Sequence, residues 1–249
     1  MGADVAANGN MSHTSISFRS LSELNSQVIS CELCPKLRRY CAQVAVKKRR
    51  QFSQWDYWGR PLPGFGDPQG RLLVLGLAPA AHGGNRTGRM FTGDGSAQFL
   101  MAALHRFGFA NKPTSDSVDD GLELRDAYMT AIVRCAPPKN RPKPKEIENC
   151  KRYWTQELTL LKNVRIVLAL GRVAFDTYVR FMKERGVQTK DLRFHHAAFY
   201  MLPTPFPALC ASYHPSRQNT QTGKLTVSMF AKVFRKIQGF LVSEVSNPT

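Results

Sequence analysis

The sequence lacks any apolar run that approaches the roughly 20 residues needed to span a bilayer, which excludes a membrane-spanning helix of the ordinary kind. Its amino terminus also lacks a basic segment followed by an apolar block, so we expect no signal peptide and a cytoplasmic, nucleoid-associated location. The chain contains no internal repeat. Hydrophobic residues nevertheless make up 43% of the 249 residues, which is enough for a packed core.

Acidic residues are scarce. The 18 Asp and Glu face 35 Lys and Arg, which gives a formal net charge of +17. An excess of this size indicates an anionic partner, and nucleic acid is the simplest one. Charge alone also fits good solubility, association with ribosomes, or a patch that binds a membrane surface.

The usual nucleotide-binding signatures are missing too. A compact apolar run, Leu72–Leu77, breaks into a Gly- and Ala-rich loop that continues to Asp94, but no GK[ST] or GxGxxG pattern occurs there. The stretch Gly76–Thr92 is seventeen residues long. It is either an elaborated strand-to-helix loop without chemistry, or a binding loop, which its concentration of His, Asn, Arg and Asp favours.

Short apolar runs bounded by breakers alternate with helical patterns, and this alternation predicts a three-layer α/β/α fold around a mostly parallel, four-stranded sheet. Ligands of such sheets bind at the carboxyl ends of the strands. We expect a disordered tail over residues 1–17, a single domain over residues 18–245, and an irregular segment over Val44–Phe65. The expected strands are Leu72–Leu77, Tyr128–Val133, Val164–Leu170 and Ala208–Tyr213; the expected helices are Phe18–Ile29, Ser96–Phe107, Pro144–Leu161, Arg172–Arg185 and Gly223–Leu241.

The chain has only six cysteines, and without a secretory signal they indicate metal binding or plain burial rather than disulfides. Cys31 and Cys34 have the spacing of a metal clamp, and Cys135 with Cys150 forms a second, wider pair. By spacing alone these residues fit zinc or an iron–sulfur cluster about equally, and Cys41 is a competing ligand.

Three segments carry a resemblance to a known family. GLAPAAHGGNRTGRMFTGD, residues 76–94, resembles the first active-site motif of the family 5 uracil-DNA glycosylases. YHPSRQNTQTG, residues 213–223, resembles their second motif, and VRCAPPKNRPKPKEIENC, residues 133–150, resembles a cysteine-containing segment shared with family 4. The resemblance runs from about Ile29 to Leu241.

The resemblance implies a [4Fe–4S] cluster held by Cys31, Cys34, Cys135 and Cys150, while Cys41 and Cys210 fall outside the pattern. We expect this cluster to have a structural role, tying the amino-terminal segment to the region around residues 135–150. It implies double-stranded DNA containing uracil as the partner of a monomeric enzyme. The residues expected to contact DNA are Arg86, Arg89, Ser216, Arg217, Gln218 and Asn219.

The same resemblance implies a catalytic group. Removal of uracil requires a flipped base, stabilisation of negative charge on the uracil oxygens, and a water delivered to C1′. Phe91 would stack on the base, His214 would donate to an oxygen, and Asp94 would position water, although Asp94 could equally cap a helix. Asn140 would bind the base or the water. Further base contacts are expected from the loop residues Gly76, Leu77, Ala78, Ala80 and His82.

The loop departs from the better-known relatives in ways that imply a broad substrate range. Ala78 stands where family 1 keeps its catalytic Asp, Leu77 where family 4 keeps a Glu, and Ala131 where family 4 keeps an Asn. We therefore expect excision of hypoxanthine and 5-hydroxymethyluracil as well as uracil, without strand cleavage. The alternatives are a non-catalytic iron–sulfur protein that binds nucleic acid, and a zinc-bearing regulator.

Overall fold

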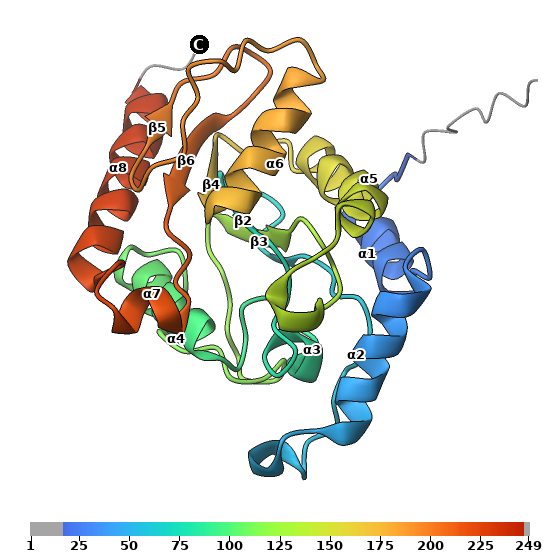
Figure 1. Ribbon diagram of the computed structural model, residues 1–249. Coiled ribbons are helices and arrows are strands. Elements are labelled where there is room, and N and C mark those ends of the chain that lie inside the picture. Colours follow the sequence, from blue (N-terminus) through green and yellow to red (C-terminus); the bar gives the residue numbers. More distant parts are fainter. Residues whose placement is uncertain (1–16, 247–249) are drawn as a thin grey trace, which may run out of the picture.

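The computed structural model describes residues 17–246, so the predicted disordered tail lies outside the described residues except for its last position. A sheet with the strand order β1-β3-β2-β4-β6-β5 forms its centre (Figure 1). The inner four strands are parallel, as predicted. They are β2 (Leu72–Gly76), β3 (Ala127–Ala131), β4 (Ile166–Leu170) and β6 (Ala208–Ser212).

Two further strands lie at the edges of the sheet, so the predicted strand count of four was too low. β1 (Phe65–Gly66) pairs antiparallel with β3, and β5 (Phe199–Tyr200) pairs antiparallel with β6. Each is only two residues long, and a pattern of alternating burial cannot show itself over two residues.

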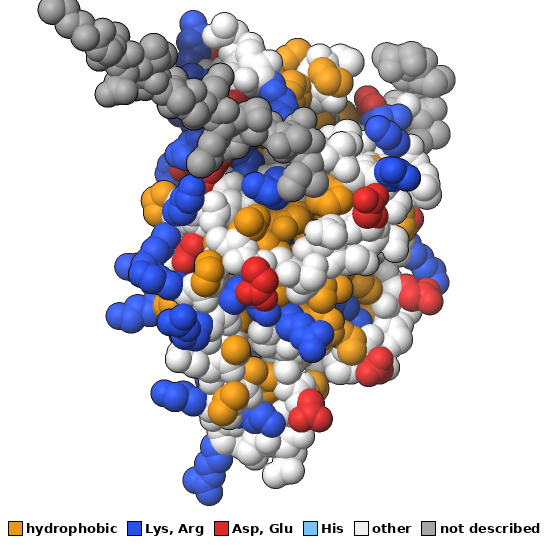
Figure 2. All heavy atoms as spheres, turned by 90° about the vertical axis from the view of Figure 1, so that its right-hand side faces the viewer, with side chains coloured by type: hydrophobic (Ala, Val, Ile, Leu, Met, Phe, Trp, Pro, Cys, Tyr) orange, Lys and Arg blue, Asp and Glu red, His pale blue; other side chains and the backbone are white. Residues whose placement is uncertain are grey.

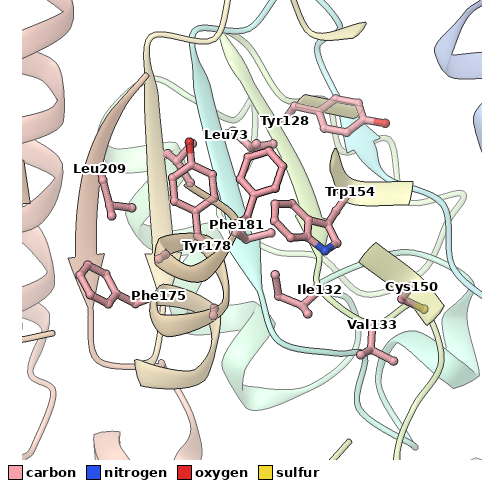
Figure 3. Packing of buried hydrophobic residues seen from close by; sticks show 14 of the residues in the cluster. Leu73, Tyr128, Ile132, Val133, Cys150, Trp154, Phe175, Tyr178, Phe181 and Leu209 are labelled. Carbon is pink, nitrogen blue, oxygen red and sulfur yellow. The ribbon is translucent and has the colours of Figure 1, made fainter. Parts of the chain in front are cut away.

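Every residue of the four inner strands is buried, because helices cover both faces of the sheet. α5 (Pro144–Leu160) and α6 (Arg172–Lys183) pack against one face, and α4 (Gly95–Arg106) and α8 (Val227–Ser246) against the other. Figure 3 shows the first of these layers, where the ring centroids of Trp154 and Phe181 lie 4.9 Å apart in the layer that contains Leu73. The predicted three-layer architecture is confirmed.

The remaining helices lie at the ends and sides of this sandwich. α1 (Leu21–Ile29) packs on α5, and α3 (Gly84–Thr87) and α7 (Arg217–Gln221) are short helices in the loops after β2 and β6. No helix among residues 17–246 is both long enough and apolar enough to cross a membrane.

One helix contradicts the expectation of an irregular segment from Val44 onward. α2 spans Pro35–Lys47, with Pro35 as its first residue, and is followed by the 3-10 turn η1 (Arg50–Phe52). Proline lacks the N–H that goes unpaired at a helix start, and its fixed φ suits that position. Pro35 therefore begins a helix whose last residues extend into the segment that was expected to be irregular.

A buried ion pair fastens the end of β3 to α5. Arg134 and Glu157 are 1% and 0% exposed at their side chains, and an Arg134 Nη2 donates to Glu157 Oε2. Thr130 Oγ1 donates to the same carboxylate oxygen. Since Arg134 directly precedes Cys135 and α5 carries Cys150, the pair fixes how these two cysteines are held relative to each other.

We predict that Glu157→Ala lowers the free energy of unfolding by about 3–5 kcal/mol, because it leaves Arg134 as an uncompensated buried cation. The measurement is urea denaturation followed by circular dichroism. Glu148→Ala, an exposed position on the same helix, is the matched control. The double variant Arg134→Met/Glu157→Leu should be more stable than Glu157→Ala, and a loss below about 1 kcal/mol in the single variant would contradict a structural role for the pair.

Candidate active site

A pocket of about 390 Å³ opens at the carboxyl ends of the parallel strands. The segments that follow β2, β3 and β6 all contribute to it, as expected for a sheet of this type. Its lining consists of Leu77, Ala78, Pro79, Ala80, Gly84, Met90, Phe91, Asp94, Ser96, Ala131, Lys139, Asn140, Arg141, His214, Ser216 and Gln218. Another hollow, of about 570 Å³, lies at the opposite end of the sheet. The only carboxylate in its lining is Asp126, which is already engaged in an ion pair with Arg71 at 2.6 Å.

The ring of Phe91 lies directly on the end of β2. A Cβ atom at Gly76 would stand 2.7 Å from Phe91 Cζ, which is closer than real Cβ atoms approach a neighbour. Phe91 itself has a φ of 47°, a conformation that is rare for a bulky side chain. Glycine at position 76 therefore allows the ring to stand at the pocket wall, where a flat base could stack on it.

Asp94 caps a helix and also lines the pocket. It is the N-cap of α4, and its Oδ1 accepts a hydrogen bond of 2.9 Å from the backbone N–H of Ala97. Its other oxygen lies against Gly83, where a Cβ would stand 2.2 Å away. Because Asp94 also lines the pocket, capping fixes the carboxylate in place without removing it from the site.

Burial raises the pKa of Asp94 above its ordinary value. The backbone N–H groups of Ala97 and Ser96, and the charges of Arg217 and Arg86, act in the opposite direction. The carboxylate is thus buried at the pocket wall, where two backbone N–H groups and two arginines favour its charged form and burial opposes it.

His214 follows β6 and lines the pocket together with residues of the β2 loop. Burial lowers its pKa to about 4, so the ring is neutral at physiological pH. The backbone carbonyl of His214 accepts a 2.8 Å hydrogen bond from Asn219 Nδ2, and Ser216 Oγ caps α7 by accepting from the N–H of Asn219. These bonds fix the turn that carries the imidazole.

Asn140 stands on a strained turn at the rim of the pocket. It ends the 3-10 turn η2 (Pro138–Asn140), and both it and Lys139 have a φ of 55°. Two consecutive non-glycine residues in the left-handed region cost free energy, and such strain is typical of functional sites. Lys139 and Arg141 flank Asn140 and also line the pocket, but they were not among the predicted site residues. Their position next to Asn140 in the sequence could have indicated that they belong to the site.

Only some of the residues predicted to contact the base line the pocket. Leu77, Ala78 and Ala80 line it, and Gly76 lies beneath the Phe91 ring. His82 does not line it, because its Nδ1 pairs with the hydroxyl of Tyr57 at 3.0 Å.

The predicted DNA contacts divide in the same way. Ser216 and Gln218 line the pocket, and Arg217 is exposed beside Gly95 at the start of α4. Arg217 and Gln218 thus remain available to DNA, whereas the amide of Asn219 is engaged within the turn.

Arg86 and Arg89 do not fit the predicted contact with DNA, since their side chains are buried. Arg89 is 5% exposed and forms an ion pair with Asp120 at 2.7 Å. Arg86 is 3% exposed and donates to the carbonyls of His82 and Gly93, both at 2.9 Å. Both cations therefore stabilise the loop from inside. The number of arginines in a loop sequence does not show which of them are buried and which are exposed.

The four predicted cluster ligands lie on three segments that meet beside α5. Cys31 and Cys34 precede α2, Cys135 follows β3, and Cys150 is in α5; all are free thiols. Within residues 17–246 no three His, Cys, Asp or Glu side chains are close enough together to hold a single metal ion. Cys150 still lies within electrostatic range of Cys34 and Cys31, and Asn149 Nδ2 donates to Cys34 Sγ at 3.3 Å.

Cys41 and Cys210 fall outside the predicted ligand set, but Cys41 lies next to it, because its thiol and that of Cys135 are hydrogen-bonding partners. Cys41 is fully buried in α2 and its thiol donates to the carbonyl of Ala136 at 3.4 Å. Cys210 lies inside β6 and is also fully buried, as a small core residue would be.

Comparison with known proteins matches residues 63–238 to the uracil DNA glycosylase superfamily. A type-5 uracil-DNA glycosylase of Thermus thermophilus is 50% identical over 204 residues, which is 82% of this chain and 90% of the relative. One of Pyrobaculum aerophilum is 45% identical over 211 residues, 85% and 89% of the two chains. A type-4 enzyme of the same organism is 27% identical over 199 residues, 79% and 83%. The chain therefore belongs to the uracil-DNA glycosylase superfamily, and within it to the type-5 enzymes.

Proposed function

We propose that the protein is a monofunctional glycosylase that hydrolyses the N-glycosidic bond of uracil in double-stranded DNA and leaves an abasic site. It would act as a monomer in the cytoplasm, on the nucleoid. The observation that supports this most directly is the pocket itself, which Phe91, Asp94, Asn140 and His214 line together with the small or apolar residues from Leu77 to Ala80. The relatives named as type-5 uracil-DNA glycosylases share this chain over most of its length.

Each group has a task that fits its surroundings. The extruded base stacks on Phe91, and the neutral imidazole of His214 donates a hydrogen bond to a uracil oxygen as negative charge develops there. Asp94, fixed by its cap, orients the water toward C1′ in its charged form and stabilises the cationic sugar. The backbone from Leu77 to Ala80 is near enough to contact the base edge, since these residues line the pocket.

A broad substrate range follows from the chemistry of the pocket wall. Ala78 and Ala131 line it and present only methyl groups, and Leu77 presents an apolar side chain. A site rejects a wrong base strongly when its own buried polar side chains would be left unpaired, and these three positions offer none. We therefore propose that hypoxanthine and 5-hydroxymethyluracil are substrates beside uracil.

We further propose that Cys31, Cys34, Cys135 and Cys150 hold a [4Fe–4S] cluster. A cubane cluster binds each cysteine through a different iron, so its thiolates stand farther apart than the ligands of a single metal ion. This agrees with the described cysteines, which lie in one region but are too far apart to bind one ion together. The amide of Asn149, which donates to Cys34 Sγ, is a hydrogen bond of the kind that supports cluster sulfurs. When bound, the cluster would supply a cross-link between the amino-terminal segment and α5.

Excision of uracil is the first test. We expect the protein to release uracil, hypoxanthine and 5-hydroxymethyluracil from duplexes, detected as alkali-labile abasic sites. Asp94→Asn should lower the single-turnover rate about 10²- to 10⁴-fold, the usual contribution of a general base, while the helix remains capped because Asn caps as well as Asp. Asp94→Ala should lose both rate and roughly 1 kcal/mol of stability.

Asp119→Asn, at an exposed carboxylate away from the pocket lining, is the control for Asp94. Full activity in Asp94→Asn combined with instability in Asp94→Ala would reduce Asp94 to a cap. If no base is released from any duplex, the enzyme proposal fails and a non-catalytic iron–sulfur protein that binds DNA takes its place.

The pKa values predict a particular pH dependence. The excision rate should fall as the pH drops through the raised pKa of Asp94, because protonation removes the charge that orients water, and Asp94→Asn should lack this acid limb. By nitrogen-15 NMR, the His214 ring should stay neutral until the pH approaches about 4. A His214 titration near its ordinary value of about 6.5 would contradict the neutral donor.

The cluster is tested by iron content and visible absorption of purified variants. Cys150→Ser should lose both signals, because a hydroxyl is a poor replacement for a cluster thiolate. Cys210→Ser, at a buried cysteine outside the ligand set, should keep them. Stoichiometric zinc in place of iron would overturn the cluster in favour of a zinc site.

A further inference from the structure

The segment from Lys47 to Trp58, here called the basic arm, has no part in the pocket. It contains four consecutive cations, Lys47 to Arg50, followed closely by the aromatics Phe52, Trp55, Tyr57 and Trp58. It leaves the end of α2 and extends below the carboxyl edge of the sheet (Figure 1). Figure 2 shows Lys and Arg side chains continuing to this lower end of the molecule.

The arm is fastened to the loop that forms the active site. The guanidinium of Arg86 lies between the rings of Phe52 and Trp55, 3.9 and 4.1 Å from their centroids. The Tyr57 hydroxyl pairs with His82 Nδ1 at 3.0 Å, and the backbone N–H of Trp58 donates to the backbone carbonyl of Arg86 at 3.0 Å. Cation–π stacking of a buried guanidinium on two rings is stronger than at an exposed site, so this attachment is firm.

Arg86 belongs to α3, whose first residue, Gly84, lines the pocket. The arm is therefore one short helix away from the site of base excision. Arg49 is close enough to His82 that its charge contributes to lowering the pKa of that imidazole, after burial. Arg49 and Arg50 also closely precede Phe52 in the chain, and the Phe52 ring contacts Arg86, so both cations lie near the active-site loop.

These cations are also free to bind an outside anion. Arg49 and Arg50 are exposed, and within residues 17–246 neither makes an ion pair or a side-chain hydrogen bond. Lys48 is the only arm cation that meets a carboxylate, Asp56, at 4.0 Å. Exposed arginines held on a rigid support are suited to phosphate groups, which they can bind through two parallel hydrogen bonds.

We propose that the basic arm is a second DNA contact, in which Arg49 and Arg50 bind backbone phosphates of the duplex to one side of the flipped base. The proposal rests on the proposed glycosylase function for the identity of the anion. Arg86 then acts as a positioning residue, since it joins the arm to the loop that carries Asp94. Phosphate contacts of this kind supply affinity and register without reading sequence.

The test compares Arg49→Gln/Arg50→Gln with the wild type. Binding to a duplex that carries a non-hydrolysable abasic analogue should weaken, and the slope of log K against log salt should become shallower by about 1 to 2, as expected for the loss of one or two phosphate contacts. The single-turnover rate at saturating enzyme should be unchanged, because the arm does not touch the base. Asp94→Asn should instead lower the single-turnover rate and leave the salt dependence of binding unchanged.

Arg165→Gln/Arg180→Gln is the charge-matched control. Both residues are exposed, and they lie just before β4 and in the last turn of α6, at the end of the sheet away from the pocket. An equal effect of the two double variants would overturn the proposal, because only overall charge would then matter.

Duplex length supplies the directional test. Shortening the duplex on one side of the lesion to well under a helical turn of about 10 base pairs should abolish the difference between wild type and Arg49→Gln/Arg50→Gln. Shortening the other side should preserve it. A difference insensitive to both truncations would overturn the proposal. If the wild type releases no base yet this pattern of binding holds, the glycosylase function fails while the arm contact stands.

Discussion

The loop between β2 and α4 keeps its shape because two of its contacts leave no room for a side chain. The Phe91 ring lies against Gly76, and the Asp94 carboxylate lies against Gly83. A methyl group at either glycine would collide with the ring or the carboxylate and displace it. The low side-chain bulk of this loop therefore fixes the distance between an aromatic stacking surface and the only carboxylate in the pocket, and the proposed chemistry depends on that distance.

A second constraint is the placement of positive charge. The protein has an excess of cations, yet Arg86, Arg89 and Arg134 are buried and serve the interior. Arg89 and Arg134 pair with carboxylates, while Arg86 donates to two carbonyl oxygens through Nε and Nη2 and lies against two aromatic rings. Burying a charge is costly unless it is compensated, so these partners are as much part of the site as the residues that face the pocket. The cations that remain exposed, Arg49 and Arg50 among them, are the ones available to DNA.

The sequence predicted the architecture well where burial enforces a pattern. All four inner strands are fully buried, and a buried strand appears as an apolar run whatever its neighbours are. The edge strands and α2 were missed, since two-residue strands show no period and a proline is read more readily as a helix breaker than as the first residue of a helix. For the site, the motifs predicted Phe91, Asp94, Asn140 and His214, which all line the pocket, but not that His82 lies outside it or which loop arginines are buried. Burial of Arg86 depends on Phe52 and Trp55, which are more than 30 residues away in the chain.

The central claim is that a flipped base is held on Phe91 between a fixed Asp94 and a neutral His214. The most direct test is a crystal structure of Asp94→Asn with a duplex containing uracil, since this variant keeps the cap and slows cleavage of the glycosidic bond. The account predicts uracil stacked on Phe91, with one oxygen facing the His214 ring and C1′ facing residue 94. Uracil that remains stacked in the duplex while the pocket is filled by another part of the DNA, or a base bound outside this pocket, would contradict it.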